Sequence, residues 1–245
     1  MNKTKRQESF YDEFYKINNQ PGAGRIKDFF FNRFIKKSLE NQKGYALEIG
    51  CGDGILTGYL LEKKIKVTGI DISAKGIDVL KNRYKEGVKR GLLKAICGDV
   101  IKYMNSTGNK YDFVIGSGII HHIPKEKWSA FFGGVFRVLK KGGIFSCGPE
   151  PGVDLYNSIF WRFAPFFYNK VFKIPYDEQV EKGTFDMKYR NLAEALEKAG
   201  FTSIEILPYQ VIPHFNIKQL ALIDRNLVNR FHAKFAAYII VKAVK

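Results

Sequence analysis

Residues 47–54 read Leu-Glu-Ile-Gly-Cys-Gly-Asp-Gly, an apolar run that breaks into glycines at alternate positions. This pattern predicts a tight turn where a buried strand ends, because glycine has no Cβ and lets the backbone approach a ligand closely. Residues 55–63 then carry apolar side chains at helical spacing, and residues 64–70 form an apolar-rich strand that ends at Asp71. A strand-turn-helix-strand unit of this length places the carboxylate at the end of its second strand beside the turn, where it can accept hydrogen bonds from ribose hydroxyls. The segment therefore predicts a nucleotide-type cofactor site.

Two features of this segment argue against a dinucleotide. Gly50, Gly52 and Gly54 have the spacing G-x-G-x-G, whereas a dinucleotide turn reads G-x-G-x-x-G. In addition, Glu48 lies inside the strand just before the turn, where a charged carboxylate would repel a pyrophosphate. The sequence therefore favours a cofactor without a pyrophosphate.

Four segments, in order along the chain, resemble the motifs of class I S-adenosylmethionine-dependent methyltransferases. Residues 47–54 resemble the first motif. Residues 69–73, Gly-Ile-Asp-Ile-Ser, resemble the second-strand motif, whose acid binds ribose, and residues 97–100, Cys-Gly-Asp-Val, resemble the third-strand motif, whose acid meets the adenine amine. Residues 111–119 resemble the fourth strand.

Two later segments resemble the small-molecule branch of that family, which includes the quinone-biosynthesis methyltransferases. They are residues 121–123, His-His-Ile, and residues 136–143, Phe-Arg-Val-Leu-Lys-Lys-Gly-Gly. Lys141 stands where proline is usual, and the turn rests on the two glycines that follow it. The resemblance is densest over residues 45–150.

The resemblance implies an α/β fold: a Rossmann-like, seven-stranded, mostly parallel sheet flanked by helices, with an N-terminal helical cap and an aromatic helical insertion after the fifth strand. It also implies S-adenosylmethionine as cofactor. The residues that it assigns to the cofactor are Glu48, Gly50, Cys51, Gly52, Asp71, Ile72, Asp99, Val100, Ser117 and, from the cap, Tyr15, with Tyr11 as the alternative in the same helix. The alternative is that Asp71 and Asp99 cap helices, and that Glu48 is a buried acid satisfied by backbone donors.

Length and composition predict one domain. A chain of 245 residues with 45% hydrophobic content can bury one substantial core. We expect a single domain over residues 1–245, whose parts are a helical cap (1–43), a cofactor-binding core (44–150), a lid or substrate insertion (151–187) and the end of the sheet with a helical insertion (188–245). The N-terminal residues are polar and basic without an apolar stretch after them, which predicts a cytoplasmic protein. Three widely spaced cysteines predict reduced thiols and no metal site.

The formal charge of +16 invites an RNA methyltransferase as the competing function. However, the 30 lysines and 10 arginines are scattered, with no Arg-rich tract or RNA-binding module. The fourth strand also ends in Gly-Ser-Gly, not in the Asn/Asp-Pro-Pro-Tyr that base-amine methyltransferases use. Nucleic acid is therefore the disfavoured partner, and a cofactor-binding module without catalysis is a third alternative.

Aromatic residues gather in three places outside the motifs. Helices are predicted over residues 7–16 and 26–39, and the related enzymes fold such N-terminal helices over the cofactor pocket. Residues 156–176 contain nine aromatic residues with interleaved cations, which can stack bases, line an apolar pocket or sit at a membrane interface. We favour a lid over an apolar or aromatic small-molecule acceptor, lined by Tyr156, Phe160, Trp161 and Tyr168.

A basic amphipathic helix is predicted over residues 217–231, between strands at 203–207 and 236–244. It either closes the substrate cleft or rests on anionic lipid together with the aromatic insertion. Contact with a membrane would suit a methyltransferase that acts on a lipid precursor. The sequence leaves the oligomeric state open.

Catalysis of methyl transfer needs alignment first and a base only when the acceptor must lose a proton. His121 and His122 stand just past the fourth strand, at the sheet edge where ligands bind, and either can be the base. Glu150, after a fifth strand predicted over residues 143–148, can orient one of them. The alternative is that the two histidines pack the loop. The sequence thus predicts methylation of oxygen, nitrogen or activated carbon on a small acceptor.

Overall fold

The computed structural model describes residues 3–17, 34, 38, 43–154, 157–166, 177, 180–211, 224 and 226–245. The predicted helix over residues 26–39 therefore lies outside the described residues except for Phe34 and Ser38. Most of the predicted helix over residues 217–231 lies outside them too. Neither prediction is tested.

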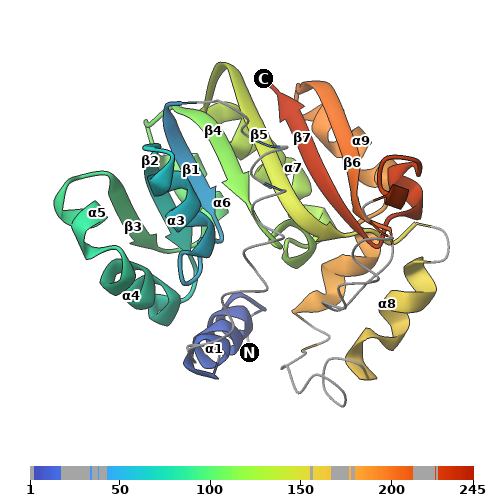
Figure 1. Ribbon diagram of the computed structural model, residues 1–245, viewed down its shortest axis with the longest axis horizontal. Helices are drawn as coiled ribbons and strands as arrows, with labels where there is room; N and C mark the ends of the chain where they lie inside the picture. The colour runs from blue at the N-terminus through green and yellow to red at the C-terminus, as the bar shows by residue number, and fades with distance from the viewer. Residues whose placement is uncertain are drawn as a thin grey trace.

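One sheet organises the described part of the chain (Figure 1). Its seven strands lie in the order β3-β2-β1-β4-β5-β7-β6. The pairs from β3 to β5 are parallel, whereas β7 runs antiparallel to both β5 and β6. The predicted mostly parallel, seven-stranded sheet is confirmed. The strands are β1 (Tyr45–Ile49), β2 (Lys66–Asp71), β3 (Leu93–Cys97), β4 (Tyr111–Gly116), β5 (Leu139–Pro151), β6 (Thr202–Gln210) and β7 (Tyr238–Val244).

Helices cover both faces of the sheet (Figure 1). Successive residues of a strand point to opposite faces, so Ala46 of β1 packs in one core with α3 and α4, while Leu47 packs in the other with α6, α7 and α9. A central strand buried on both faces reads as a continuous apolar run, which is why β1 has no alternation. The α-helices are α1 (Lys3–Ile17), α3 (Ile55–Glu62), α4 (Ala74–Arg83), α5 (Lys85–Lys89), α6 (Val100–Ser106), α7 (Trp128–Val138), α8 (Asn157–Phe166) and α9 (Tyr189–Lys198).

The strand order places a ligand crevice between β1 and β4. The chain moves outward from β1 to β2 and β3, then returns to the other side of β1 with β4, so the order reverses there. In open parallel sheets, ligands bind outside the carboxyl ends of the strands at such a switch point. Figure 1 shows α1 below these strand ends. The cap helix and the glycine turn thus face the same crevice.

Several element boundaries differ from those predicted. β4 ends at Gly116 rather than at residue 119, because Gly118 takes a left-handed φ of 62° and the chain turns into a short 3-10 helix, η1 (Ile120–His122). β5 continues to Pro151, so Glu150 lies within a strand and not after it. The first helix starts at Lys3 rather than at residue 7. A helix, α8, does follow the fifth strand as expected.

Among the described residues, no helix combines the length and the apolar character needed to cross a bilayer.

Candidate functional site

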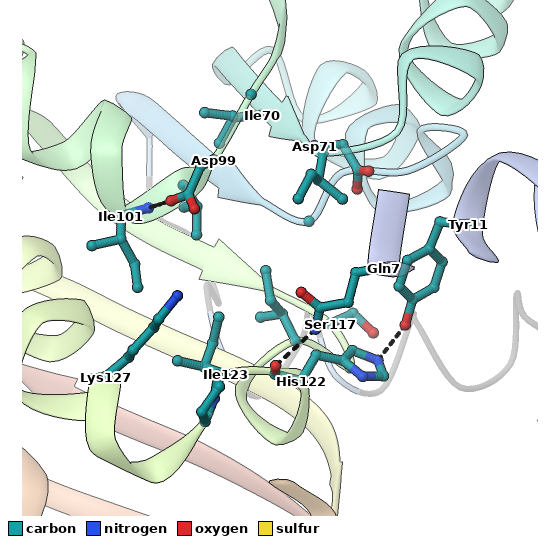
Figure 2. A pocket seen from close by; sticks show the side chains of 17 residues that line it. Gln7, Tyr11, Ile70, Asp71, Asp99, Ile101, Ser117, His122, Ile123 and Lys127 are labelled. Atoms are coloured by element: carbon teal, nitrogen blue, oxygen red, sulfur yellow. Dashed lines mark hydrogen bonds between the residues drawn. The ribbon is translucent and has the colours of Figure 1, made fainter. Parts of the chain in front are cut away.

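A cavity of about 250 Å³ opens at the switch point (Figure 2). Its walls come from the ends of β1, β2, β3 and β4, from the loop after β4, and from α1. The lining residues are Gln7, Tyr11, Gly50, Ile70, Asp71, Ile72, Gly98, Asp99, Val100, Ile101, Ser117, Gly118, Ile119, His122, Ile123, Pro124 and Lys127. Six of the predicted cofactor residues, Gly50, Asp71, Ile72, Asp99, Val100 and Ser117, therefore lie around one cavity.

The glycine turn brings bare backbone to the cavity wall. Gly50 has a φ of 67°, and the amides of Gly50 and Cys51 both donate to the carbonyl oxygen of Ile70, at 2.8 and 3.1 Å. A Cβ on Gly50 would stand 2.8 Å from Cδ1 of Ile119, closer than carbon atoms approach. Glycine is therefore favoured here by the left-handed backbone conformation, and a Cβ would also require the end of the Ile119 side chain to shift.

Asp71, at the end of β2, is fixed by backbone donors on both carboxylate oxygens. Oδ2 accepts from the amide of Gly52 at 2.9 Å, and Oδ1 accepts from the amide of Ser73 at 2.8 Å. Burial raises the pKa of this carboxyl, although the two amide hydrogen bonds oppose the shift. The N-cap of α4 is Ser73, whose hydroxyl accepts from Gly76, so capping does not account for Asp71. Each oxygen keeps a second lone pair for a ligand hydroxyl.

Asp99, after β3, does cap a helix. Its Oδ1 accepts from the amides of Ile101 and Lys102, at 2.8 and 3.0 Å, at the start of α6. Both bonds use the same oxygen, and within the described ranges no partner is found for Oδ2. Because Asp99 also lines the cavity, helix capping and contact with a ligand are compatible roles for this residue. The cap holds the carboxylate still while its second oxygen remains available to a ligand donor.

Three predicted cofactor residues, Glu48, Cys51 and Gly52, stand behind the cavity wall and not in it. Glu48 is buried and accepts a 2.5 Å hydrogen bond from the hydroxyl of Thr57 on α3. Burial raises the pKa of Glu48 to about 8, and the nearby Asp71 adds to the shift, so the group is protonated at neutral pH. The expected repulsion between Glu48 and a pyrophosphate is therefore wrong, because the side chain carries no charge there. Gly52 acts through its amide on Asp71.

The two histidines after β4 have different surroundings. His122 lines the cavity, and its Nε2 lies 2.5 Å from the hydroxyl of Tyr11 on α1 (Figure 2). Its Nδ1 lies 3.4 Å from the carbonyl oxygen of Val180. A carbonyl oxygen only accepts, so this contact favours the tautomer with the proton on Nδ1, in which Nε2 accepts from Tyr11. The side-chain amide of Gln7 donates to the carbonyl oxygen of His122 at 3.0 Å, which fixes the backbone of the same residue.

His121 does not line the cavity, and its ring contacts Glu150 on β5. Its Nδ1 lies 2.7 Å from Oε2 of Glu150, whose Oε1 accepts from the amides of Ile119 and Ile120 at 2.7 and 3.0 Å. Burial opposes ionisation of Glu150, but the hydrogen bonds from His121 and Ile120 outweigh it, so the pKa of Glu150 is lowered. A buried carboxylate thus pins the loop after β4 to the neighbouring strand. Sequence reasoning joined Glu150 to a histidine correctly, but that histidine does not line the cavity.

Helix α1 is held over the cavity by polar contacts with distant segments. Besides the two contacts at His122, a carboxylate oxygen of Asp12 accepts from the hydroxyl of Ser73, at the N-terminus of α4. At its other end, Nε of Arg6 pairs with Oδ2 of Asp177 at 2.8 Å. The expectation that an N-terminal helix covers this pocket is confirmed for Gln7 and Tyr11, which line the cavity.

The remaining predicted residues are not tested. Tyr156 and Tyr168 lie outside the described residues, and the side chains of Tyr15, Phe160 and Trp161 are not described either.

Sequence reasoning left Tyr11 and Tyr15, one helical turn apart, as alternatives for the site, because the register of the helix over the crevice was the missing information. The structure places Tyr11 in the cavity lining. Sequence reasoning missed Lys127, which extends into the cavity from the 3-10 helix η2 (Lys125–Lys127) in Figure 2. No motif marks that lysine.

The lining suits an S-adenosyl cofactor. Asp71 offers paired acceptors for a ribose diol, Asp99 offers one oxygen for an amine, and Ile72, Val100 and Ile101 form apolar walls for a flat base. Gly50 adds bare backbone to the cavity lining beside the turn. Over the same described residues, no three His, Cys, Asp or Glu side chains gather as a metal site requires.

The fold and this cavity define a Rossmann-like domain of the kind that binds nucleoside cofactors, and comparison with known proteins shows which family part of the chain matches. A family described as "Methyltransferase domain" matches residues 46–143. The chain is 28% identical over 183 residues to an uncharacterised methyltransferase of Synechocystis sp., covering 70% of this chain and 75% of that protein. It is 26% identical over 179 residues to a ubiquinone biosynthesis O-methyltransferase of Coxiella burnetii, covering 71% and 70%.

Other relatives match over a shorter length. The chain is 29% identical to a demethylmenaquinone methyltransferase of Leptospira interrogans over 119 residues, which are 46% of this chain and 47% of that protein. Among solved structures, a SAM-dependent methyltransferase from Archaeoglobus fulgidus superposes with a TM-score of 0.62 at 18% identity, covering 96% of this chain and 100% of the other. Phosphoethanolamine N-methyltransferase 2 of Haemonchus contortus, in complex with S-adenosyl-L-methionine, superposes with a TM-score of 0.62 at 19% identity, covering 98% and 57%.

The match over residues 46–143 and the methyltransferase names of the relatives agree with the resemblance to the class I S-adenosylmethionine-dependent methyltransferases, and S-adenosylmethionine is the cofactor that this family and the cavity suit. Small molecules are the acceptors that the relatives and neighbours are named for.

Proposed function

We propose that this protein methylates an oxygen or nitrogen of a small acceptor, in the cavity beneath α1, with Tyr11 and His122 removing the proton that the acceptor loses. The observation that carries the proposal is the 2.5 Å contact between the Tyr11 hydroxyl and Nε2 of His122, inside the cavity that Asp71 and Asp99 also line. S-adenosylmethionine supplies an electrophilic methyl group whose departure leaves a neutral thioether, so the reaction needs no acid for the leaving group.

In this proposal, residues at the ends of the strands hold the cofactor. Asp71 accepts the ribose hydroxyls, Asp99 accepts from the adenine amine through Oδ2, and the backbone at Gly50 borders the methionine part. Glu48 and Gly52 support these residues from behind the wall, Glu48 through Thr57 and Gly52 through Asp71. With the nucleoside held from the side of β2 and β3, the reactive methyl group would face the loop after β4, where His122 lies.

Proton removal follows from the tautomer of His122. Nε2 holds a lone pair that accepts from Tyr11, so Tyr11 can take a proton from the acceptor as it passes its own to Nε2. Tyr11 is on α1, and the same helix closes the cavity against water. Docking of α1 therefore both excludes water and places the Tyr11 hydroxyl in the cavity, and Asp12 and Gln7 hold the helix in that position.

The acceptor side of the cavity is largely apolar. Ile119, Ile123 and Pro124 line it beside His122, while Lys127 brings one positive charge. Apolar walls suit an aromatic acceptor of the kind that quinone-biosynthesis relatives are named for. The lysine also suits an anionic one such as the phosphoethanolamine of a structural neighbour. We propose the shared chemistry, a small apolar or aromatic acceptor with a hydroxyl or amine to be methylated.

The test separates cofactor binding from proton transfer. Binding of S-adenosylhomocysteine is measured by calorimetry, and methyl transfer from radiolabelled S-adenosylmethionine is measured against phenolic quinone precursors, phosphoethanolamine and RNA. Replacing Tyr11 by Phe should lower kcat by about 10²- to 10⁴-fold on the true acceptor, while affinity for S-adenosylhomocysteine is kept. Tyr189→Phe is the matched control, because Tyr189 lies on α9 and does not line the cavity.

Two results would overturn the proposal. Undiminished turnover by both Tyr11→Phe and His122→Ala would remove the proton-transfer role. Methyl transfer to RNA alone, lost at raised salt, would replace the small acceptor by nucleic acid.

A further inference from the structure

Helix α8 carries an apolar stripe that faces solvent. Ile159, Phe163 and Phe166 are exposed to 60%, 57% and 58% of their surface, and their spacing of four and three residues puts them on one helix face. We call these three residues the α8 stripe. Proteins rarely leave large apolar side chains together on an exposed helix face unless something covers them in use.

The sequence segment that contains the α8 stripe is basic and aromatic. Residues 155–176 hold no aspartate or glutamate, but they contain Arg162, Lys170 and Lys173 within a chain of formal charge +16. Arg162 is exposed and directly precedes Phe163. Apolar side chains together with cations, in a sequence segment without acids, are the composition of helices that lie in the interface of an anionic bilayer.

A second exposed apolar group lies at the same end of the molecule. Figure 1 shows α8 and the segment before β7 both at the end of the sheet that carries β6, away from β3. In that segment Phe231 and Phe235 pack edge to face with ring centres 6.0 Å apart, and both remain about two-fifths exposed, at 42% and 39%. Exposed cations, Arg230 and Lys234, lie beside them in sequence.

We infer that the α8 stripe docks on an anionic lipid surface. Burial of its three side chains in the headgroup boundary removes apolar area from water, and Arg162 adds attraction to lipid phosphates. The complementarity of charge favours lipid over an apolar protein groove, because a groove would gain nothing from the cations. No described residue of α8 lines the cavity, so the surface is separate from the methyl-transfer site. Docking would hold the enzyme where apolar acceptors partition.

The experiment measures flotation of the whole chain with two kinds of vesicle, phosphatidylglycerol mixed with phosphatidylcholine and phosphatidylcholine alone. We expect binding to the anionic vesicles that weakens as salt rises. The double variant Phe163→Ser/Phe166→Ser should lower the vesicle affinity by at least about tenfold, and Arg162→Gln should lower it by about fivefold. Val88→Ser is the control, because Val88 is another exposed apolar residue, 39% exposed, on α5.

Each other outcome overturns the inference. It fails if the parent protein does not float with anionic vesicles or if the double variant floats as well as the parent. It fails too if Val88→Ser lowers the vesicle affinity as much as the double variant does. It also fails if the double variant instead lowers the mass measured by sedimentation, which would make the stripe a contact between copies of the chain. Thermal melting and S-adenosylhomocysteine affinity, both expected to stay unchanged, show that the variants fold. They also keep this result independent of the proposed methyl transfer.

Discussion

Replacing Glu150 by Gln tests whether a buried carboxylate holds the loop that carries both histidines. Oε1 of Glu150 accepts from the amides of Ile119 and Ile120 and lies 3.1 Å from Sγ of Cys147. Oε2 lies 2.7 Å from Nδ1 of His121 and 3.4 Å from the amide of the same residue. Glutamine keeps the shape of the side chain, but it turns one oxygen into a donor.

The cost depends on which oxygen becomes the amide nitrogen. If the nitrogen takes the place of Oε1, it faces two amide donors at hydrogen-bond distance. If it takes the place of Oε2, His121 can shift its proton to Nε2 and accept, and only the long 3.4 Å contact is lost. The second arrangement is favoured, and the loss of charge assistance plus one weakened donor amounts to about 2 kcal/mol. Glu150→Ala leaves every donor unpaired and should cost about 4 kcal/mol.

The pH dependence has a definite sign. The pKa of Glu150 is lowered from its ordinary 4.5, so its contribution is fully present above that pH and is lost as the pH falls through the lower, folded-state pKa. The difference in stability between the parent and Glu150→Gln should therefore be constant near neutrality and shrink below pH 4.5.

Urea denaturation and thermal melting measure both effects. For a chain of this size, a loss of about 2 kcal/mol corresponds to a fall in Tm of about 4–8 °C. Glu194→Gln is the control, because Glu194 lies on the surface of α9, paired with Arg190, and should leave Tm unchanged. A Glu150→Gln variant as stable as the parent at neutral pH would refute the reasoning, since it would mean that the loop is not held by this carboxylate.

Three further outcomes are expected. Gly50→Ala should weaken S-adenosylhomocysteine binding, because its left-handed φ strains a residue with a Cβ and Ile119 must shift to make room for one. Gly133→Ala, which has open space at the Cβ and lies outside the cavity lining, should bind as the parent does in calorimetry. The raised pKa of Glu48 means that the parent protein loses stability as the pH rises from 4.5 to about 8, because ionisation of this carboxyl favours the unfolded state. Glu48→Gln should remove that loss, which thermal melting at several pH values measures. A variant with the same pH profile as the parent would contradict this. Asp12→Asn should weaken the contact with Ser73 and speed proteolytic cleavage within α1, and equal cleavage rates would contradict it.

The strand ends were predictable from the sequence because their signals are local. An apolar run that stops at glycine fixes the end of β1, and an acid directly after an apolar run fixes Asp71 and Asp99 at the same sheet edge. Parallel strands in this order then bring those ends together without any further information.

The assignment of the two histidines was not predictable in the same way. His121 and His122 are neighbours, and which ring enters the cavity depends on the turn that Gly118 begins and on the carboxylate of Glu150, 29 residues from His121. Likewise, the choice between Tyr11 and Tyr15 depends on how α1 lies on the sheet. These are long-range packing questions, and a single sequence carries only weak signals for them.

The contacts of α1 also have a consequence for the order of folding. Asp12, Tyr11 and Arg6 meet partners that are 61, 111 and 171 residues away in sequence. Closing loops of that length is entropically costly, so α1 should dock after the sheet has formed and contribute little to the folding transition state. Mutations in α1 should then speed its detachment without slowing the folding of the sheet. Natural variation in this helix could thus tune how readily the site opens while the rest of the domain keeps its folding rate.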